Sequence, residues 1–284
     1  MTFITKEIAN GKRIHEIVTL KYLIENHTLT LTKMKTLLKK SHAYVNEAVI
    51  HSVIQVLSLS FFDVRRGKQT KKEKYGDQSL IDFKKSQISL SSLFKRELEN
   101  QDFKKLVCDA LTAALQINQS YDNEVQFTLY QKYSRKDVCR LLNWDKDVSA
   151  PLYGYHVTDN VCPIFIIYHK KENDSNEYYH NELLDNAILT WYTRSPRTLR
   201  SPEVMKLLKG VNEKRPQVKI YLFIKHDQVK DKEFTYIGRG EIIPFSAHET
   251  TLKVPHKNDK RVVQFKIKLM HPLSLQEYYH LFKN

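Results

Sequence analysis

The sequence is poor in the residues and motifs with which most enzymes hold nucleotides or metals. Only 7 glycines occur in 284 residues, and neither a GxxxxGK[ST] phosphate loop nor a GxGxxG fingerprint is present. The 12 histidines form no HExxH motif, and His169, His180 and His226 lie at no metal-ligand spacing from cysteines or carboxylates. We therefore expect no catalytic residue, no metal and no cofactor in this segment.

Cysteines and long apolar runs are also scarce. Cys108, Cys139 and Cys162 stand too far apart for a disulfide framework or a CxxC metal site, which indicates a reducing, cytoplasmic location. Cys108 and Cys139 fall within apolar helical patterns, so we expect both to be small core residues. The longest apolar run, residues 164–167, is far too short to cross a bilayer, and no membrane partner is expected.

Positive charge, by contrast, is abundant. Lys and Arg number 46 against 32 Asp and Glu, a net charge of +14, and the pI is near 9.4. Residues 1–119 hold 20 cations against 12 acids, which leaves 26 against 20 for the remainder, so both parts are basic. Because Lys and Arg release the counterions of phosphates when they bind them, this balance favours a polyanion, and double-stranded DNA is the expected partner.

The first 119 residues are predicted to form a helical domain. Apolar residues recur at helical spacing over residues 14–23, 31–38, 45–57, 90–98 and 103–117. Three helices, an expected strand at 57–64 and a basic hairpin at 65–74 resemble a winged helix, in which Arg65, Arg66 and Lys68 are candidate contacts to the DNA backbone. No cation lies between Lys40 and Arg65, so a role as a mere connector stays open.

The pattern changes to strand-like segments in the second predicted domain, residues 120–284. Strands are expected at 124–130, 163–169, 218–225, 234–243 and 261–269. Helix-start signals occur at Ser134, at Ser201 before Pro202, and at Ser274. Irregularly spaced strands with short helices indicate a mixed, mostly antiparallel curved sheet or barrel. The whole chain is therefore predicted to be an α+β protein.

Aromatic and basic residues gather in four stretches of this second domain: YSRKDVCRLLNW (133–144), PLYGYHV (151–157), CPIFIIYHK (162–170) and WYTRSPRTLRSPEV (191–204). Aromatic rings stack on bases, and arginines hold phosphates. Tyr153 and Tyr155 are the candidate stacking residues, with Trp191 as a pocket wall. The candidate backbone contacts are Arg194, Arg197 and Arg200.

Taken together, these stretches resemble the C-terminal region of SauUSI-like type IV restriction enzymes, which cut DNA containing modified cytosine and carry phospholipase D-type nuclease and superfamily 2 helicase domains. The resemblance covers residues 125–284. It implies an SRA-like curved β-barrel, flanked by helices, that flips 5-methylcytosine or 5-hydroxymethylcytosine into a pocket, where Asp147 or Asp159 accepts from the cytosine amino group. Residues 1–119 would be a helical coupler to the helicase and nuclease domains, and only that parent hydrolase would need ATP and Mg²⁺.

Two other functions remain open from the residues alone. A winged-helix regulator with a ligand-sensing second domain would show sequence-specific DNA binding by residues 1–119. A self-contained endonuclease would cleave DNA in a metal-dependent way, and its site would lie among scattered carboxylates and lysines.

Overall fold

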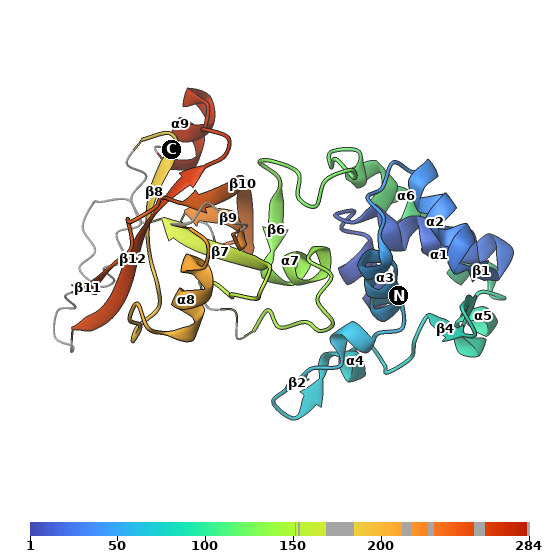
Figure 1. The fold of residues 1–284 in the computed structure, drawn as a ribbon. Coiled ribbons are helices and arrows are strands. Elements are labelled where there is room, and N and C mark those ends of the chain that lie inside the picture. The colour runs from blue at the N-terminus through green and yellow to red at the C-terminus, as the bar shows by residue number, and fades with distance from the viewer. Residues whose placement is uncertain are drawn as a thin grey trace. The chain divides into compact units, whose positions relative to one another are not determined.

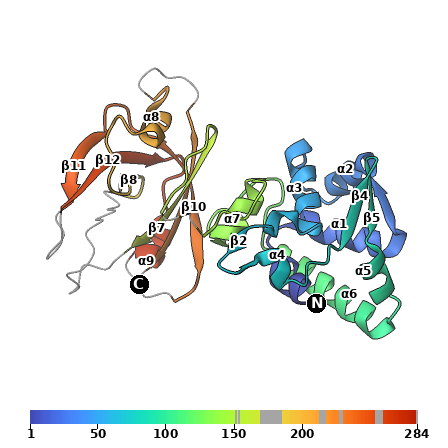
Figure 2. The same ribbon diagram turned by 90° about the horizontal axis from the view of Figure 1, so that it is seen from below.

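The computed structural model contains both helices and antiparallel sheets, which confirms the predicted α+β class (Figure 1). It describes residues 1–150, 152, 154–168, 185–211, 217–226, 230–252 and 259–282, except the side chains of Arg66 and Phe282. The chain forms two compact units, Met1–Pro151 (unit 1) and Leu152–Asn284 (unit 2). Figure 2 shows the elements of each unit from a second side.

Unit 1 consists mainly of helices, with a small three-stranded sheet. Its helices are η1 (Ile4–Ile8), α1 (Ile14–Asn26), α2 (Leu31–Lys40), α3 (Glu47–Leu57), η2 (Ser60–Phe62), α4 (Lys71–Lys74), α5 (Ser92–Glu97), α6 (Gln101–Asn118) and α7 (Arg135–Leu141). The sheet has the order β1-β5-β4, all antiparallel, from β1 (Thr28–Thr30), β4 (Ile81–Lys84) and β5 (Gln87–Leu90). A hairpin of β2 (Arg65–Arg66) and β3 (Gln69–Thr70) and the short β6 (Lys132–Ser134) complete the unit.

The five helical segments predicted in this unit are confirmed, and their starts have local causes. The side chains of Thr30 and Asn46 accept hydrogen bonds from backbone N–H groups in the first turns of α2 and α3. The strand predicted at 57–64 is wrong. Leu59 takes a left-handed conformation, φ 63°, and Phe61 and Phe62 then form a 3₁₀ turn that buries both rings on the same side, which an alternating strand would not do.

The strand predicted at 124–130 is also wrong. Phe127 packs edge-to-face on Tyr133, with ring centroids 5.4 Å apart, while Val125 is exposed. The Thr128 N–H donates to the Tyr133 hydroxyl at 2.9 Å, not to a neighbouring strand. The apolar residues of this segment therefore anchor an irregular loop beside β6.

Residues 132–147 join unit 1 through buried charged groups. The carboxylate of Asp137, on α7, accepts from Lys12 at 3.2 Å and lies 3.4 Å from Arg140. Arg140 donates to the Glu7 carbonyl at 2.6 Å, and Arg13 donates to the Arg140 carbonyl at 3.2 Å. Contacts accordingly divide the chain at Pro151, whereas the boundary expected at residue 119 stays a prediction.

His15 lies beside this cluster and makes unit 1 sensitive to mild acid. Its Nε2 is 2.7 Å from the Tyr44 carbonyl, and its Nδ1 is buried without a partner. Burial and the nearby charge of Arg13 lower the pKa of His15 to about 4. In the unfolded chain the pKa would be about 6.5, so as pH falls from 6.5 towards 4 only the unfolded state takes up this proton.

We expect the free energy of unfolding of unit 1 to drop by on the order of 3 kcal/mol across that pH window because of His15. His15→Gln, which keeps a donor for the Tyr44 carbonyl but does not titrate, should remove this part of the pH dependence. Denaturant unfolding at pH 7 and pH 4 measures it, with the exposed His42→Gln as control. An unchanged pH dependence in His15→Gln would contradict the assignment.

Unit 2 is built on a mixed sheet. Its strands are β7 (Val161–Tyr168), β8 (Ile188–Tyr192), β9 (Lys219–His226), β10 (Glu233–Ile242), β11 (His248–Leu252) and β12 (Lys260–Leu269), and its helices are α8 (Pro202–Leu208) and α9 (Leu275–Phe282). Among the strand pairs described within unit 2, β7 and β9 pair in parallel and the others are antiparallel. The strands predicted around 163–169, 218–225, 234–243 and 261–269 are thus confirmed, and so is a mixed, mostly antiparallel sheet.

The sheet is curved but open among the described residues (Figure 1). The pairing path runs from β8 through β12, β10 and β9 to β7, and no described pair closes it into a barrel. Gly240 lies at the crowded middle of this path. A Cβ there would come within 2.5 Å of Ile267 and 3.0 Å of Leu222, so glycine allows the three strands to approach closely, as the sequence indicated for residues 238–241.

Candidate nucleic-acid interface

Tyr155 and Trp191 meet where the two ends of the unit 2 sheet come close to each other. Tyr155 forms a β-bridge with Ile164 of β7, at one end of the path, and Trp191 belongs to β8, at the other. Their rings are edge-to-face, with centroids 4.9 Å apart, and Trp191 also stacks on its cross-strand partner Phe265. Both side chains are almost fully buried. The two residues therefore lie in contact within the core, and their predicted roles as stacking residue and pocket wall stay predictions.

Glu203, in the first turn of α8, is the centre of a cluster that the sequence did not single out. Its carboxylate accepts from the Tyr155 hydroxyl, from Nη2 of Arg194 at 2.7 Å and from Nε of Arg197 at 2.5 Å. Arg194 also lies over the Tyr155 ring, with its guanidinium carbon 5.0 Å from the centroid. We call Tyr155, Trp191, Arg194, Arg197 and Glu203 the Glu203 cluster.

The partners of Glu203 fix its charge state. Partial burial alone would raise the pKa of Glu203, but the hydrogen bonds from Arg194, Tyr155 and Arg197 outweigh it and lower the pKa. Burial, together with the bond to Glu203, raises the pKa of Tyr155. At neutral pH the cluster therefore contains an ionised carboxylate and a neutral phenol that donates to it.

An open groove of about 370 Å³ lies along this cluster, lined by Val157, Arg197, Ser201, Pro202, Glu203 and Lys206. Arg194, Arg197 and Lys206 face two carboxylates, Glu203 and Asp159, the latter 2.7 Å from Lys206. Three cations against two anions leave a net positive charge. An ionised carboxylate offers about four acceptor positions, and the three donors here leave one of them for a ligand.

The other predicted pocket and backbone residues of unit 2 are more dispersed. Asp159 has an 83% exposed side chain that pairs with Lys206, and that lysine lowers the pKa of its carboxyl. Arg200 is exposed, in the turn before α8. Tyr153 lies outside the described residues, so its predicted stacking role stays a prediction.

Asp147 belongs to unit 1, where it is fully buried. It accepts from Lys71 at 2.9 Å and from the Ser149 N–H at 3.1 Å. Burial would raise its pKa, but Lys71 and Ser149 outweigh this and lower it. A carboxylate enclosed in this way suits a structural ion pair and not the predicted contact with a base.

The predicted backbone contacts of unit 1 lie on the β2–β3 hairpin. Arg65 and Lys68 are exposed, while the side chain of Arg66 lies outside the described part of the structure. The predicted basic hairpin at 65–74 is thus a short hairpin, residues 65–70, followed by the single turn of α4, which begins with a capping box at Thr70 and Glu73.

The cysteines and histidines of the described residues show no sign of a reactive or metal site. Cys139 and Cys162 are buried, and burial raises the pKa of both thiols, which keeps them unreactive. Cys108 is exposed, so the expectation that it is a core residue is wrong: it lies on the solvent side of α6. Over the described ranges no three His, Cys, Asp or Glu side chains lie close enough to hold a metal, and no helix is long and apolar enough to cross a membrane.

Residues 127–281, which include the whole Glu203 cluster, match the family described as domain of unknown function DUF3427. The chain belongs to the DUF3427 family. Residues 1–123 match a second family, described as domain of unknown function DUF8090. The DUF3427 segment begins within unit 1 and includes α7, so the family boundary and the contact boundary differ by some two dozen residues. A search of curated proteins gave no match.

Two solved structures show a distant likeness to the chain that contains this DUF3427 segment. The DNA modification-dependent restriction endonuclease AspBHI is 10% identical with a TM-score of 0.36, over 54% of this chain and 80% of that protein. The type IV phosphorothioation-dependent restriction endonuclease ScoMcrA is 10% identical with a TM-score of 0.32, over 94% of this chain. The chain spans about half, 55%, of ScoMcrA.

Proposed function

We propose that this chain is the DNA-recognition region of a type IV restriction endonuclease. It binds 5-methylcytosine or 5-hydroxymethylcytosine in double-stranded DNA, with the base flipped out of the duplex, and so directs cleavage by nuclease and helicase domains of a larger parent protein. Unit 2 would have an SRA-like fold, and the segment itself would not be catalytic.

The observation that carries this proposal is the Glu203 cluster beside its positively charged groove. The cations suit the phosphates that flank an extruded nucleotide. The free acceptor position of Glu203 suits the amino group of cytosine, the role first expected of Asp147 or Asp159. The joint occurrence of the aromatic and basic motifs at 133–204 supports the same class of function.

In this proposal Tyr155 and Trp191 form the floor of the pocket that receives the flipped cytosine. The Tyr155 ring is 2% exposed, packs edge-to-face with Trp191 and lies beneath the Arg194 guanidinium, so no face of it is open to a base in the structure described. Tyr155 would position Glu203 through its hydroxyl, and Arg194 and Arg197 would exchange part of their contact with Glu203 for phosphate oxygens.

Matched duplexes with and without a modified cytosine test the proposal. A buried methyl group contributes about 0.8 kcal/mol, so we expect the complete chain to bind the modified duplex about fourfold more tightly. Fluorescence anisotropy at physiological salt measures both affinities. Equal affinities would rule out recognition of the modified base.

Glu203→Gln is expected to abolish this preference: the amide is a weaker acceptor and its NH₂ group opposes the cytosine amino group, so the flipped base would no longer be held where its methyl group is buried. Asp159→Asn is the matched control, since it removes one negative charge from the same groove but leaves Glu203 intact. A preference retained in Glu203→Gln would show that another residue reads the base.

A further inference from the structure

Unit 1 contains a second basic surface, at a hairpin that the sequence did not predict. The order of elements α1, β1, α2, α3, β4, β5, with β5 between β1 and β4, places an antiparallel hairpin directly beside a three-helix core. This is the arrangement of a winged helix. The β4–β5 hairpin therefore corresponds to the wing, and the β2–β3 hairpin is an insertion between α3 and β4.

The tip of the β4–β5 hairpin exposes two lysines. Lys84 ends β4, and Lys85 and Ser86 form the two-residue turn with φ values of 47° and 63°, both left-handed. That turn type matches the twist of the strands and holds the hairpin tip in one conformation. Lys84 and Lys85 are exposed, and within the part of the chain that the structure describes neither makes an ion pair.

The chain between α3 and this turn is strongly basic. Residues 63–85 contain eight cations (Arg65, Arg66, Lys68, Lys71, Lys72, Lys74, Lys84, Lys85) and four acids (Asp63, Glu73, Asp77, Asp82), a net charge of +4. Two of the cations are occupied, since Lys71 pairs with Asp147 and Lys72 with Asp77. This excess of positive charge beside two exposed hairpins favours contact with the phosphate backbone of DNA.

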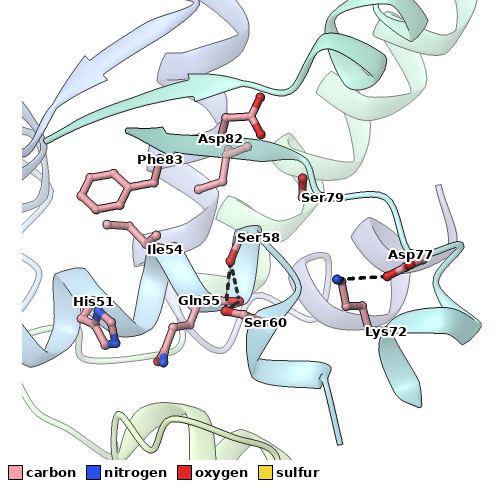
Figure 3. A pocket seen from close by; sticks show the side chains of 11 residues that line it. His51, Ile54, Gln55, Ser58, Ser60, Lys72, Asp77, Ser79, Asp82 and Phe83 are labelled. Atoms are coloured by element: carbon pink, nitrogen blue, oxygen red, sulfur yellow. Dashed lines mark hydrogen bonds and ion pairs between the residues drawn. The ribbon is translucent and has the colours of Figure 1, made fainter. Parts of the chain in front are cut away.

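A groove of about 470 Å³, lined by both polar and apolar side chains, lies between α3 and β4 (Figure 3). His51 and Gln55 of α3 and its C-cap residue Ser58 line one side, and Asp82 and Phe83 of β4 line the other. The Oε1 atom of Gln55 is buried and has no hydrogen-bond partner, while its Nε2 donates to Asp145 at 3.3 Å. An amide side chain such as that of Gln55 can hydrogen-bond a base edge in a DNA groove once it turns outward.

We infer that this face of unit 1 is a second contact to duplex DNA, in which Lys84 and Lys85 bind backbone phosphates and the His51–Gln55 side of α3 faces a DNA groove. The inference rests on the proposed function in one respect only, that the chain binds double-stranded DNA. It assigns to unit 1 the affinity that does not depend on base modification, and leaves the reading of the modified base to unit 2.

The test is a salt titration of the complete chain carrying Lys84→Gln and Lys85→Gln, with the modified and the unmodified duplex. Because each phosphate contact contributes about 0.9 to the slope of log affinity against log salt, we expect the slope to fall by roughly 2. Affinity at physiological salt should fall on the order of tenfold for both duplexes, with their ratio unchanged. Lys84→Arg with Lys85→Arg should restore the wild-type slope.

The matched control is Lys104→Gln with Lys105→Gln, two adjacent lysines on α6 that line neither hairpin nor groove. A slope in the Lys84/Lys85 variant equal to that of this control would overturn the inference, even if the chain still preferred modified DNA. Equal affinities of the wild-type chain for the two duplexes, with a reduced slope in the Lys84/Lys85 variant, would overturn the proposed reader function and support this surface. A preference present in the wild type but lost in the variant would overturn the inference. A wild-type chain that binds neither duplex would overturn both.

Discussion

Replacing Asp137 by alanine is expected to lower the free energy of unfolding of unit 1 by about 3–5 kcal/mol, because it removes one partner from a buried ionic cluster. The Asp137 side chain is 3% exposed, and its oxygens accept from Lys12 and from both the N–H and the hydroxyl of Ser134. Without the carboxylate, Lys12 and Arg140 would stay buried with uncompensated charge, and α7 would lose its capping box.

Hydrogen exchange of the amides in α1 and α7 of the complete chain measures this loss locally. Glu47→Ala is the control, because it removes an ion pair to Lys35 in which Glu47 is 79% exposed, and an exposed pair contributes at most about 1 kcal/mol. Equal effects of the two substitutions would mean that the buried cluster does not stabilise the fold.

The Asp137 cluster also predicts a response to acid. Burial would raise the pKa of Asp137, but Lys12 and Arg140 outweigh it and lower the pKa to about 2. Because the folded pKa lies below the unfolded value of about 3.9, the stabilisation is complete above pH 4. It is lost as pH falls from about 4 towards 2, a window below that of His15.

Tyr155→Ala is expected to destabilise unit 2 by about 3–5 kcal/mol, the usual cost of removing a buried aromatic ring. Tyr155 is 2% exposed and packs on Trp191, while its hydroxyl donates to Glu203. Tyr155→Phe keeps the ring and removes only the bond to a charged acceptor, which costs about 1.5–3 kcal/mol at most. Hydrogen exchange in β7 and β8 of the complete chain compares the two.

The effect of Tyr155→Ala on stability shows whether the Tyr155 ring belongs to the core or to an open stacking site. If Tyr155 were a stacking residue exposed at the surface, Tyr155→Ala would leave the free energy of unfolding unchanged and would weaken only DNA binding. If Tyr155→Ala leaves exchange in β7 and β8 unchanged, the ring is no part of the core. Binding to modified DNA is best measured on Tyr155→Phe, which separates the positioning of Glu203 from collapse of unit 2.

The sequence predicted those elements whose causes are local. Ser134 and Asp137 form the expected capping box of α7, Pro202 opens α8, and the apolar runs of β7 and β9 form the expected strands. The strands β8 and β11 were missed, because their alternation is short and interrupted by polar residues. The segment 124–130 shows the reverse failure: it alternates like a strand but finds its partners in the ring and hydroxyl of Tyr133.

The candidate site depended on contacts that no local pattern records. Glu203 in a first helical turn looks like an ordinary favourable acid near a helix start. Only the fold brings it to Arg194, Arg197 and Tyr155, the last of them 48 residues earlier in the chain. The prediction that Asp147 contacts a base has the same cause, because its partner Lys71 lies 76 residues away and no local pattern reveals the pair. The arginines spaced three apart before Glu203 were the available signal for a shared carboxylate.

The ionic cluster around Asp137 limits where this chain can recombine with a related one. A crossover between residues 123 and 127, where the two family segments meet, would separate Lys12, Arg13 and Glu7 from Asp137, Arg140 and Lys136. In such a chimera the buried charged groups of one segment would face groups of the other that do not match them. The free energy of unfolding would then fall by several kcal/mol. A crossover near Pro151 would keep all of these ion pairs and hydrogen bonds within one segment.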